Sequence, residues 1–392
     1  MSKMFLRLFI AIFIAFLITA FGHYYVFLRT LYPFYNHENP SINFIFYLLW
    51  GMTFFGFILL RILPIFLRRY FEFLMFLWMG VCYLTLLVSL LTFPLEIFFR
   101  NDSDDLQRLA LFVIGISFFI SVFAFLKAVR VPEVVEQQIS YVGPDFPLFS
   151  ELSKLKIIIL SDIHVSGIIN RSKMEELKNK VNSLQPDIIL ILGDLVDGSV
   201  KQLRHDIEPL RFLTSKYGVF YITGNHEYYS GPVQWKNYLK NDFNWNVLSN
   251  ESALIPFQNF DLCFLGLEDR HWLKYQKRKK SDTRLEYALL DLEKKRDPNK
   301  NLFFILLAHQ PKDSFLLKKN PWIHLQVSGH THAGQMWPLK YLVLKDQKYL
   351  NGLYNINKNQ FLYVSQGTGF WGPPFRLGSK CEITVLNLLP RL

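Results

Sequence analysis

The chain has 392 residues, of which 51% are hydrophobic and 38 are Phe, and its mean hydropathy of +0.17 is too high for an ordinary soluble protein. Because 43 Lys and Arg residues face 32 Asp and Glu residues, the formal net charge of +11 favours anionic partners, such as a membrane surface, phosphate-bearing substrates or nucleic acid. Three scattered cysteines imply no disulfide framework.

Four stretches before residue 130 are long and apolar enough to cross a bilayer, which takes about 20 residues each. The first runs from about Met4 to Gly22, and the second is FIFYLLWGMTFFGFILL, which ends near Leu60. The third runs from Phe73 to Phe93 and the fourth from Leu109 to Leu126. A signal peptide is the competing interpretation of the first stretch, but its apolar core is too long and three further stretches follow. Residues 1–130 are therefore predicted to form a multi-pass transmembrane region, and buried helices of a large soluble core are the alternative.

Basic residues in short loops predict which side of the membrane each loop occupies. One side of a four-span arrangement carries Arg29, Arg100 and Arg108, and the other carries Lys3, Arg7, Arg61, Arg68, Arg69, Lys127 and Arg130. This bias predicts that both termini and the C-terminal domain are cytoplasmic, and a re-entrant or interfacial first stretch would invert the prediction. No charged residue deep in the spans has an evident partner, which favours an anchor or a lipid-contacting module over a transporter.

Residues 131–392 show a different pattern, in which short apolar runs are each followed by a polar cluster. The runs and clusters are LKIIIL before SDIH, DIILIL before GDLVDG, GVFYIT before GNHEYY, LFFILLA before HQP, and HLQV before SGHTHAGQ. Apolar runs of this length are typical of buried strands. Between the first two runs, Met174, Leu177, Val181 and Leu184 recur at helical spacing, so the order is strand, helix, strand. Ligands of α/β sheets gather at such carboxyl ends of strands.

Each polar cluster taken alone has an ordinary structural explanation. Asp162 could cap a helix, Asn225 could occupy a turn, and His309 could be a hydrogen-bonded core histidine. Recurrence at five strand ends is not explained in this way. Imidazole and carboxylate ligands without cysteine suit Zn, Fe or Mn, and a pair of divalent ions can clamp both oxygens of a phosphoryl displacement. No G-x-S-x-G elbow is present, so a serine nucleophile is not indicated.

The clusters, in this order, resemble the motifs of the calcineurin-like metallophosphoesterase superfamily. The motifs D-x-H, G-D-x-x-D, G-N-H-E, a lone H and G-H-x-H correspond to Asp162–His164, Gly193–Asp197, Gly224–Glu227, His309 and Gly329–His332. The resemblance covers about residues 155–335. The tail GTGFWGPPFRLGSKCEITVLNL is also similar to the membrane-associated YkuE/YaeI-like branch, some members of which carry transmembrane helices. The resemblance implies an α/β sandwich of two β-sheets flanked by helices over residues 131–392.

The resemblance also implies roles for individual residues. One divalent metal ion (Mn, Fe or Zn) would be held by Asp162, His164 and His332, a second by Asn225, His309 and His330, and Asp194 would bridge them. Water activated by the two metals is the expected nucleophile. His226 would face the substrate and donate a hydrogen bond or proton to the phosphate or the leaving group, whereas Asp197 and Glu227 would orient their neighbours. Every motif position is occupied, so no loss of activity is indicated.

Two segments bear on the substrate. The stretch EDRHWLKYQKRKK, Glu268–Lys280, is either a solvated loop or a basic patch for an anionic membrane surface. In GFWGPPFR, Phe370 and Trp371 either line the active site, with Arg376 offered to a phosphate, or pack into a Pro-fixed turn. No specific nucleic-acid partner is expected, because no recognition motif accompanies the basic residues.

Three functions follow from these features. We favour a membrane-anchored enzyme that hydrolyses a phosphodiester or pyrophosphate bond of a lipid-linked substrate, similar to UDP-diacylglucosamine or a phospholipid. The first alternative is a phosphatase or phosphodiesterase for soluble nucleotides or phosphoproteins, in which the helices serve only as an anchor. The second is a non-catalytic membrane sensor or transporter-associated module, against which the complete set of motif residues argues.

Overall fold

The computed structural model describes residues 3–34, 40–99, 103–141, 151–276 and 282–390. It forms two compact units. The helical unit comprises Met1–Val129 together with Gly372–Phe375, and the α/β unit comprises Arg130–Trp371 together with Arg376–Leu392. Arg100 and the basic residues 277–280 lie outside the described residues.

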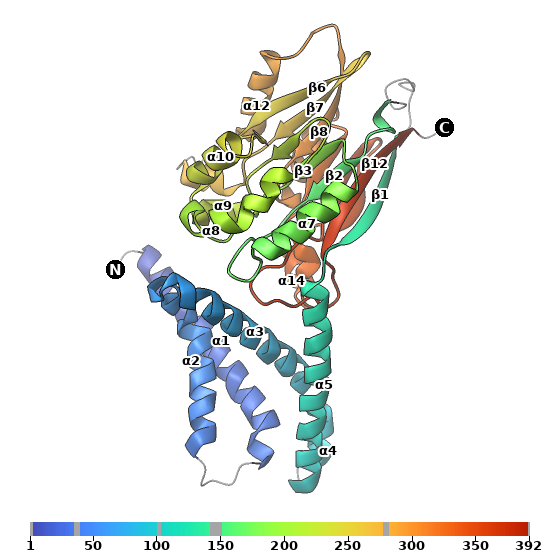
Figure 1. Cartoon of the computed structure of the whole chain (residues 1–392). Coiled ribbons are helices and arrows are strands. Elements are labelled where there is room, and N and C mark those ends of the chain that lie inside the picture. Colours follow the sequence, from blue (N-terminus) through green and yellow to red (C-terminus); the bar gives the residue numbers. More distant parts are fainter. Residues whose placement is uncertain (1–2, 35–39, 100–102, 142–150, 277–281, 391–392) are drawn as a thin grey trace. The chain divides into compact units, whose positions relative to one another are not determined.

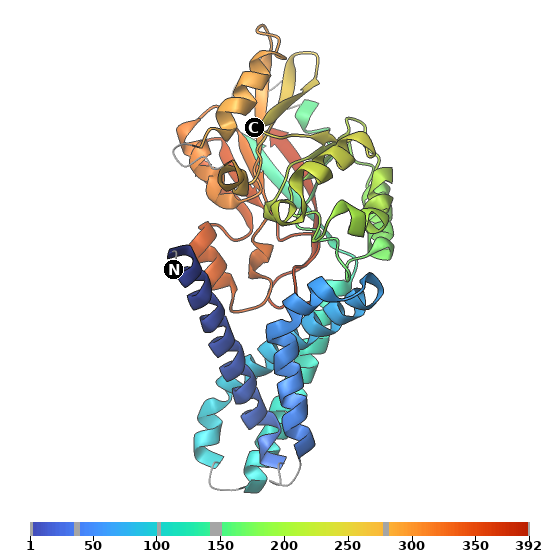
Figure 2. The ribbon, with the colours of Figure 1, turned by 90° about the vertical axis from the view of Figure 1, so that its left-hand side faces the viewer.

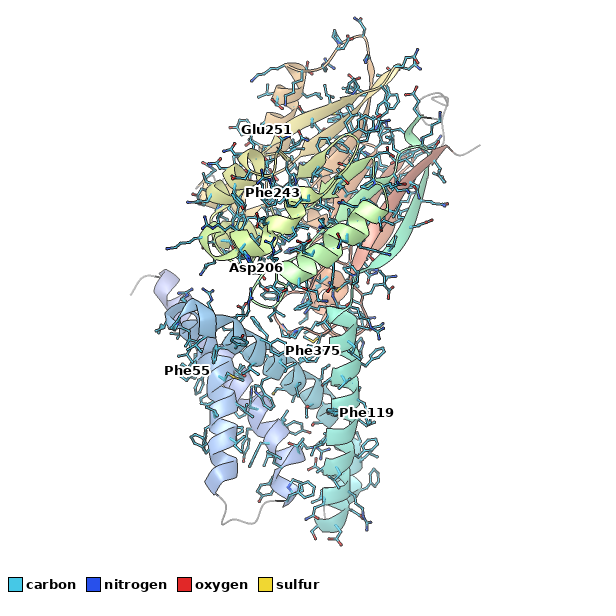
Figure 3. The ribbon with its side chains drawn as sticks, viewed as in Figure 1. Phe55, Phe119, Asp206, Phe243, Glu251 and Phe375 are labelled. Atoms are coloured by element: carbon cyan, nitrogen blue, oxygen red, sulfur yellow. The ribbon has the colours of Figure 1, made fainter. Side chains whose placement is uncertain are left out.

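The helical unit contains long apolar helices that pack on one another (Figure 2). Its elements are α1 (Lys3–Thr30), η1 (Tyr32–Phe34), α2 (Pro40–Ile62), α3 (Ile65–Leu91), α4 (Phe93–Phe99) and α5 (Ser103–Val129). α1, α2, α3 and α5 are long and apolar enough to cross a membrane, which confirms the prediction of four candidate spans. Large apolar side chains on these helices, such as Phe55 and Phe119 in Figure 3, are exposed, as is expected of surfaces that face lipid tails.

Arg29, in the last turn of α1, forms a buried ion pair that the sequence did not indicate. The segment after Gly22 continues α1 instead of leaving it, so Arg29 becomes part of the helix and is buried. Its guanidinium forms an ion pair with Glu96 on α4 and donates a hydrogen bond to Thr92 Oγ1 at 3.1 Å. A buried charge is tolerated in such a helix when it is paired in this way.

The α/β unit contains two six-stranded sheets (Figure 1). The first sheet has the order β1 (Glu133–Tyr141), β12 (Glu382–Pro390), β2 (Ile157–Leu160), β3 (Ile188–Ile191), β4 (Val219–Tyr221) and β5 (Asn246–Val247). The second has the order β10 (Gly352–Asn357), β11 (Gln360–Val364), β9 (Leu325–Ser328), β8 (Asn301–Leu307), β7 (Phe260–Gly266) and β6 (Glu251–Pro256). β2 to β5 are mutually parallel, and so are β11, β9, β8 and β7.

Helices connect and flank these strands. They are α7 (Arg171–Ser183), α8 (Val200–Ile207), η2 (Glu208–Phe212), α9 (Asn225–Ser230), α10 (Pro232–Asn241), α11 (His271–Tyr275), α12 (Arg284–Glu293), η3 (Pro311–Ser314), α13 (Phe315–Lys319), η4 (His332–Gly334) and α14 (Lys340–Gln347). α7 illustrates how the sequence specifies them: Asn170 caps it by accepting a hydrogen bond from Ser172 N, and its buried residues Met174, Leu177 and Val181 are those predicted from helical spacing.

One buried apolar core contains residues from both sheets. Ile159 and Leu190 of the first sheet belong to the same cluster as Phe264 and Ile305 of the second, so the sheets pack as a sandwich. A further cluster joins the second sheet to α12 through side chains such as Leu306 and Leu292. This architecture, with four helices long enough to cross a membrane, confirms the predicted fold class.

The order of strands explains why the polar clusters meet. β2, β3 and β4 are parallel neighbours in the first sheet, and β8 and β9 are parallel neighbours in the second. Each of the five strands is followed by one polar cluster of the sequence. Carboxyl ends of parallel strands lie at the same edge, so three clusters gather at one edge of the first sheet and two at one edge of the second.

Candidate metal centre

The first group of candidate ligands consists of Asp162, His164 and His332. One ligand atom from each residue lies within 4.8 Å of the others, and all three side chains are buried. His164 Nε2 lies 3.1 Å from His332 Nε2, and His332 Nε2 lies 3.6 Å from Asp162 Oδ1. Three buried donors from the ends of β2 and β9 therefore converge on one point, as the ligands of a metal ion do.

The second group consists of Asp194, His309 and His330, and its ligand atoms also lie within 4.8 Å of one another. His309 Nδ1 donates a hydrogen bond to Leu192 O at 2.7 Å, which leaves Nε2 to face Asp194 Oδ2 at 3.2 Å and His330 Nδ1 at 3.2 Å. A backbone carbonyl that fixes one ring nitrogen is a common support for a histidine ligand.

Asp194 lies between the two groups. Its Oδ2 is 3.2 Å from His309 Nε2 on one side and 3.9 Å from His164 Nε2 on the other. Burial by itself would raise the pKa of Asp194, but the nearby imidazole of His309, followed by those of His226 and His164, holds that pKa well below its usual range. A buried, ionised carboxylate at this position is suited to bridge two cations.

The buried polar atoms of the site fit two metal ions. The ring nitrogens of His164 and His332 lie 3.1 Å apart and those of His309 and His330 lie 3.2 Å apart, so both members of each pair could contact one cation. Asn225 Oδ1, at the start of α9, is buried without a hydrogen-bond partner among the described residues. Burial, and next to it the charge of His309, lowers the pKa of His330 to about 4, and burial and Arg376 hold the pKa of His332 well below its usual range. Both rings are therefore neutral, as metal ligands must be.

Asp197 orients two histidines at once. Its Oδ1 accepts hydrogen bonds from His164 Nδ1 at 2.9 Å and from His226 Nδ1 at 2.6 Å, so Nε2 of both rings is free to face the centre. Burial opposes ionisation of Asp197, but these two histidines outweigh it and lower its pKa to about 2. Burial lowers the pKa of His226, and the hydrogen bond to Asp197 with the charges of Asp194 and Asp197 raises it to about 9.

Glu227 supports the site from behind. Its carboxylate accepts hydrogen bonds from the backbone N–H groups of Asp194 (3.1 Å), Leu195 (2.7 Å) and Gly224 (2.6 Å). These bonds fasten the loop after β3 to the first turn of α9. Glu227 thus holds the backbone of two motifs in place, and its carboxylate is engaged by these backbone hydrogen bonds.

The backbone of the centre adopts a conformation that residues other than glycine rarely accept. Asp162, His164, Asp194, His330 and His332 all have positive φ angles, between 48° and 70°. Strained residues of this kind cluster at functional sites, where the surrounding structure holds them. In this centre the strained backbone lets a short turn direct neighbouring side chains, such as those of His330 and His332, to different groups of ligands.

Two exposed aromatic rings flank His226. The ring of Tyr229, also on α9, lies 5.5 Å from that of His226, and the ring of Trp371 lies 5.7 Å from it, both edge-on. Their exposed fractions are 67% and 55%. Trp371 is fixed by Gln335, whose side-chain amide pairs with both backbone N–H and C=O of Trp371 at 3.0 and 2.9 Å. Trp371 therefore lies beside His226, whereas Phe370 is buried.

Tyr229 is held by residues that the motifs do not include. Its hydroxyl lies 3.0 Å from His271 Nε2, and His271 Nδ1 lies 2.7 Å from Asp269, which also accepts from Gln310 Nε2 at 2.7 Å. Asp269 is 1% exposed. The sequence pointed to these contacts only in that Asp269 and His271 belong to the stretch Glu268–Lys280.

Arg376 does not face a substrate phosphate. It is fully buried, and its guanidinium donates to the carbonyl oxygens of His332 (2.7 Å), Gln366 (2.8 Å) and Gly369. The hypothesis that Arg376 binds a phosphate is therefore wrong, because carbonyl groups of the turn around His332 already occupy the guanidinium. Its role is to fix that turn.

Comparison with known proteins identifies the family. A family model described as calcineurin-like phosphoesterase matches residues 155–334, the segment that carries all seven candidate ligands and His226. An uncharacterized metallophosphoesterase of Campylobacter jejuni is 36% identical over 281 residues, which are 70% of this chain and 68% of that protein. The chain belongs to the calcineurin-like phosphoesterase family. This is the family that the motifs predicted.

Relatives of this metallophosphoesterase include membrane proteins. A "transmembrane protein with metallophosphoesterase domain" of Danio rerio is 34% identical over 276 residues, or 69% of this chain and 60% of the relative. An uncharacterized metallophosphoesterase of Helicobacter pylori is 40% identical over 240 residues, or 61% of this chain. The match spans 60% of the length of the Helicobacter protein, so the similarity covers only part of these relatives.

Proposed function

We propose that this metallophosphoesterase is a membrane-anchored enzyme with two divalent metal ions, which hydrolyses a phosphodiester or pyrophosphate bond of a lipid-linked substrate. The observation that carries the proposal is the position of Asp194 between two groups of His and Asp ligands, with His226 beside them. Asp162, His164 and His332 would hold one ion, Asn225, His309 and His330 the other, and Asp194 would bridge them. Mn, Fe or Zn suits such N and O ligands.

Two ions bound there would neutralise charge on the phosphoryl oxygens and activate a water for attack. The remaining chemistry belongs to His226. Asp197 binds its Nδ1, so its Nε2 faces the centre, 4.0 Å from Asp194 Oδ2. Burial lowers the pKa of His226, but the hydrogen bond to Asp197 and the charges of Asp194 and Asp197 outweigh it and raise that pKa, which favours the protonated ring. That ring can donate its Nε2 proton to the phosphate or to the departing oxygen.

Two features support a lipid-linked substrate. The chain has four helices long and apolar enough to cross a membrane, and such helices would hold the enzyme next to lipids. The surface beside His226 is formed by the exposed rings of Tyr229 and Trp371, and the hydroxyl of Tyr229 is engaged by His271. Exposed aromatic faces of this kind can contact the apolar part of a lipid ester. The distribution of basic residues further supports a cytoplasmic catalytic domain.

The alternative is a phosphoesterase for soluble nucleotides or phosphoproteins. Hydrolysis by the purified full-length protein, with Mn²⁺ added or a chelator present, separates the two functions. The substrates are bis-p-nitrophenyl phosphate, p-nitrophenyl phosphate and a nucleotide-linked lipid such as UDP-diacylglucosamine. We expect a metal-dependent preference for the lipid, and activity on small esters alone would favour the soluble substrate. No activity with any metal would refute catalysis, and the His226→Ala variant controls for a contaminating phosphatase.

A further inference from the structure

The α/β unit has an exposed apolar surface on and just before α14. Tyr341, Leu342 and Leu344 are 60%, 68% and 42% exposed, and Trp337 in the preceding turn is 37% exposed. Among the described residues of this unit, four of the 12 exposed large apolar side chains thus fall within eight residues of sequence. Scattered exposed apolar residues need no explanation, but a group of four on one short segment marks an interaction surface.

The same segment carries positive charge. Lys345 and Lys348 are exposed, and Lys340 Nζ lies over the ring of Tyr341 at 5.2 Å from its centroid. The single carboxylate in the sequence of α14, Asp346, is paired with Lys312 at 3.1 Å. The segment Trp337–Lys348, which we term the α14 surface, therefore combines Trp, Tyr and Leu with lysines that form no ion pair with any residue that the structure describes.

The α14 surface is fastened to the turn that carries two candidate metal ligands. A Cβ atom on Gly334 would lie 2.3 Å from Lys340 Cα, so the turn and the start of α14 touch through their backbones. Beyond the end of α14, Leu350 O accepts a hydrogen bond at 2.5 Å from the hydroxyl of Thr331, the residue between His330 and His332. The surface and the metal-ligand turn are thus joined at both ends of the helix.

We propose that the α14 surface docks on the anionic surface of a lipid bilayer. Trp, Tyr and Leu beside Lys is the composition of helices that lie in a membrane interface, where each Lys adds electrostatic attraction to anionic headgroups. The candidate spans of the same chain keep a bilayer at high local concentration, so even weak docking is populated. Docking brings the turn with His330 and His332 to the layer of lipid phosphates. This consequence rests on the proposed lipid substrate, whereas the docking itself does not.

The test is a depth measurement on the full-length protein in lipid nanodiscs. The cysteines Cys82, Cys263 and Cys381 are buried, so a Leu342→Cys variant can be labelled selectively with an environment-sensitive fluorophore. Leu290→Cys is the matched control, because Leu290 is 60% exposed on α12 of the same unit. We expect nitroxide-labelled lipids to quench the probe at 342 several-fold more strongly than the probe at 290. Equal quenching at the two positions overturns the proposal.

Charge provides the second arm of the test. Replacing Lys345 and Lys348 by Gln in the labelled variant should shift docking in anionic nanodiscs towards the undocked state by roughly fivefold per lysine. A probe at 342 that is shielded from water yet not quenched by lipid nitroxides would mean that a protein covers the surface, and it too overturns the proposal. Neither arm needs turnover, so a failure here is distinct from a failure to hydrolyse a lipid ester.

Discussion

Replacing Asp197 by Asn should weaken one metal site and slow turnover at the same time. The carboxylate receives hydrogen bonds from His164 and His226 at 2.9 and 2.6 Å, and among the described hydrogen bonds no other residue accepts from both rings. A hydrogen bond with a charged partner contributes about 1.5–3 kcal/mol, and loss of such an outer contact typically costs about 10–100-fold in metal affinity or activity. Asn keeps the shape of the side chain, so the change removes the charge without opening a cavity.

Two measurements separate the effects. Metal affinity, from competition with a chelator, reports on His164, and kcat at saturating Mn²⁺ reports on His226. Both should fall by roughly 10–100-fold. Asp346→Asn is the control, because this carboxylate is 66% exposed and its partners are Lys312 and Gln347, not His164 or His226, so both quantities should be unchanged. In the double variant Asp197→Asn/His226→Ala, kcat should equal that of His226→Ala alone. Normal metal affinity and normal kcat in Asp197→Asn would refute the orienting role.

Three further changes address the remaining residues of the site. Asp194→Asn should abolish hydrolysis and lower the content of both metals measured by elemental analysis, and full metal content would contradict the bridging assignment. His226→Ala should keep its metal and lose most turnover. Because the protonated ring is the donor and its pKa is about 9 without metal, kcat of the wild type should fall as pH rises towards 9, and bound cations should move this fall to lower pH. The fall should be absent in the variant. Trp371→Ala should lower kcat/KM for a lipid ester by about tenfold, since an aromatic contact contributes up to roughly 1.5 kcal/mol, whereas Phe212→Ala, which removes another exposed ring, should have no effect.

The sequence predicted those parts of the site that depend on short-range order. Each motif lies directly after an apolar run, and a buried run of four to seven residues with such a boundary forms a strand wherever it sits in the sheet. Parallel strands place Asp162 and Asp194 at one edge of the first sheet and His309 at one edge of the second, and it was the resemblance of the motifs to the metallophosphoesterase pattern that assigned all three to one centre. The four apolar helices were predictable for a similar reason, since span length follows from bilayer thickness.

Features that depend on long-range packing could not be predicted. Tyr229 and His271 are 42 positions apart, and only the packing of α11 against α9 brings the hydroxyl and the ring nitrogen within 3.0 Å. Arg376 was open to two interpretations because an arginine near an anionic site binds either a ligand or the backbone, and only its burial among carbonyl groups decides. Arg29 was assigned to a loop because local sequence does not fix where a long apolar helix ends.

Gly329 offers a test of whether close packing between the turn of His330 and the loop after β2 positions the metal ligands. A Cβ atom at this position would lie 1.8 Å from Ser161 Oγ and 2.3 Å from Asp162 Oδ2, so even alanine must push the turn of His330 away from the loop after β2. His330 N donates to Asp162 Oδ2 at 2.9 Å, and this hydrogen bond should be lost with the movement. Gly329→Ala should therefore lose metal and activity together. Gly115→Ala is the control, because a Cβ there meets nothing within 4 Å and Ala favours the helix. Wild-type metal content in Gly329→Ala would show that the turn can relax, and that the close contact between the strand ends is not what positions the ligands.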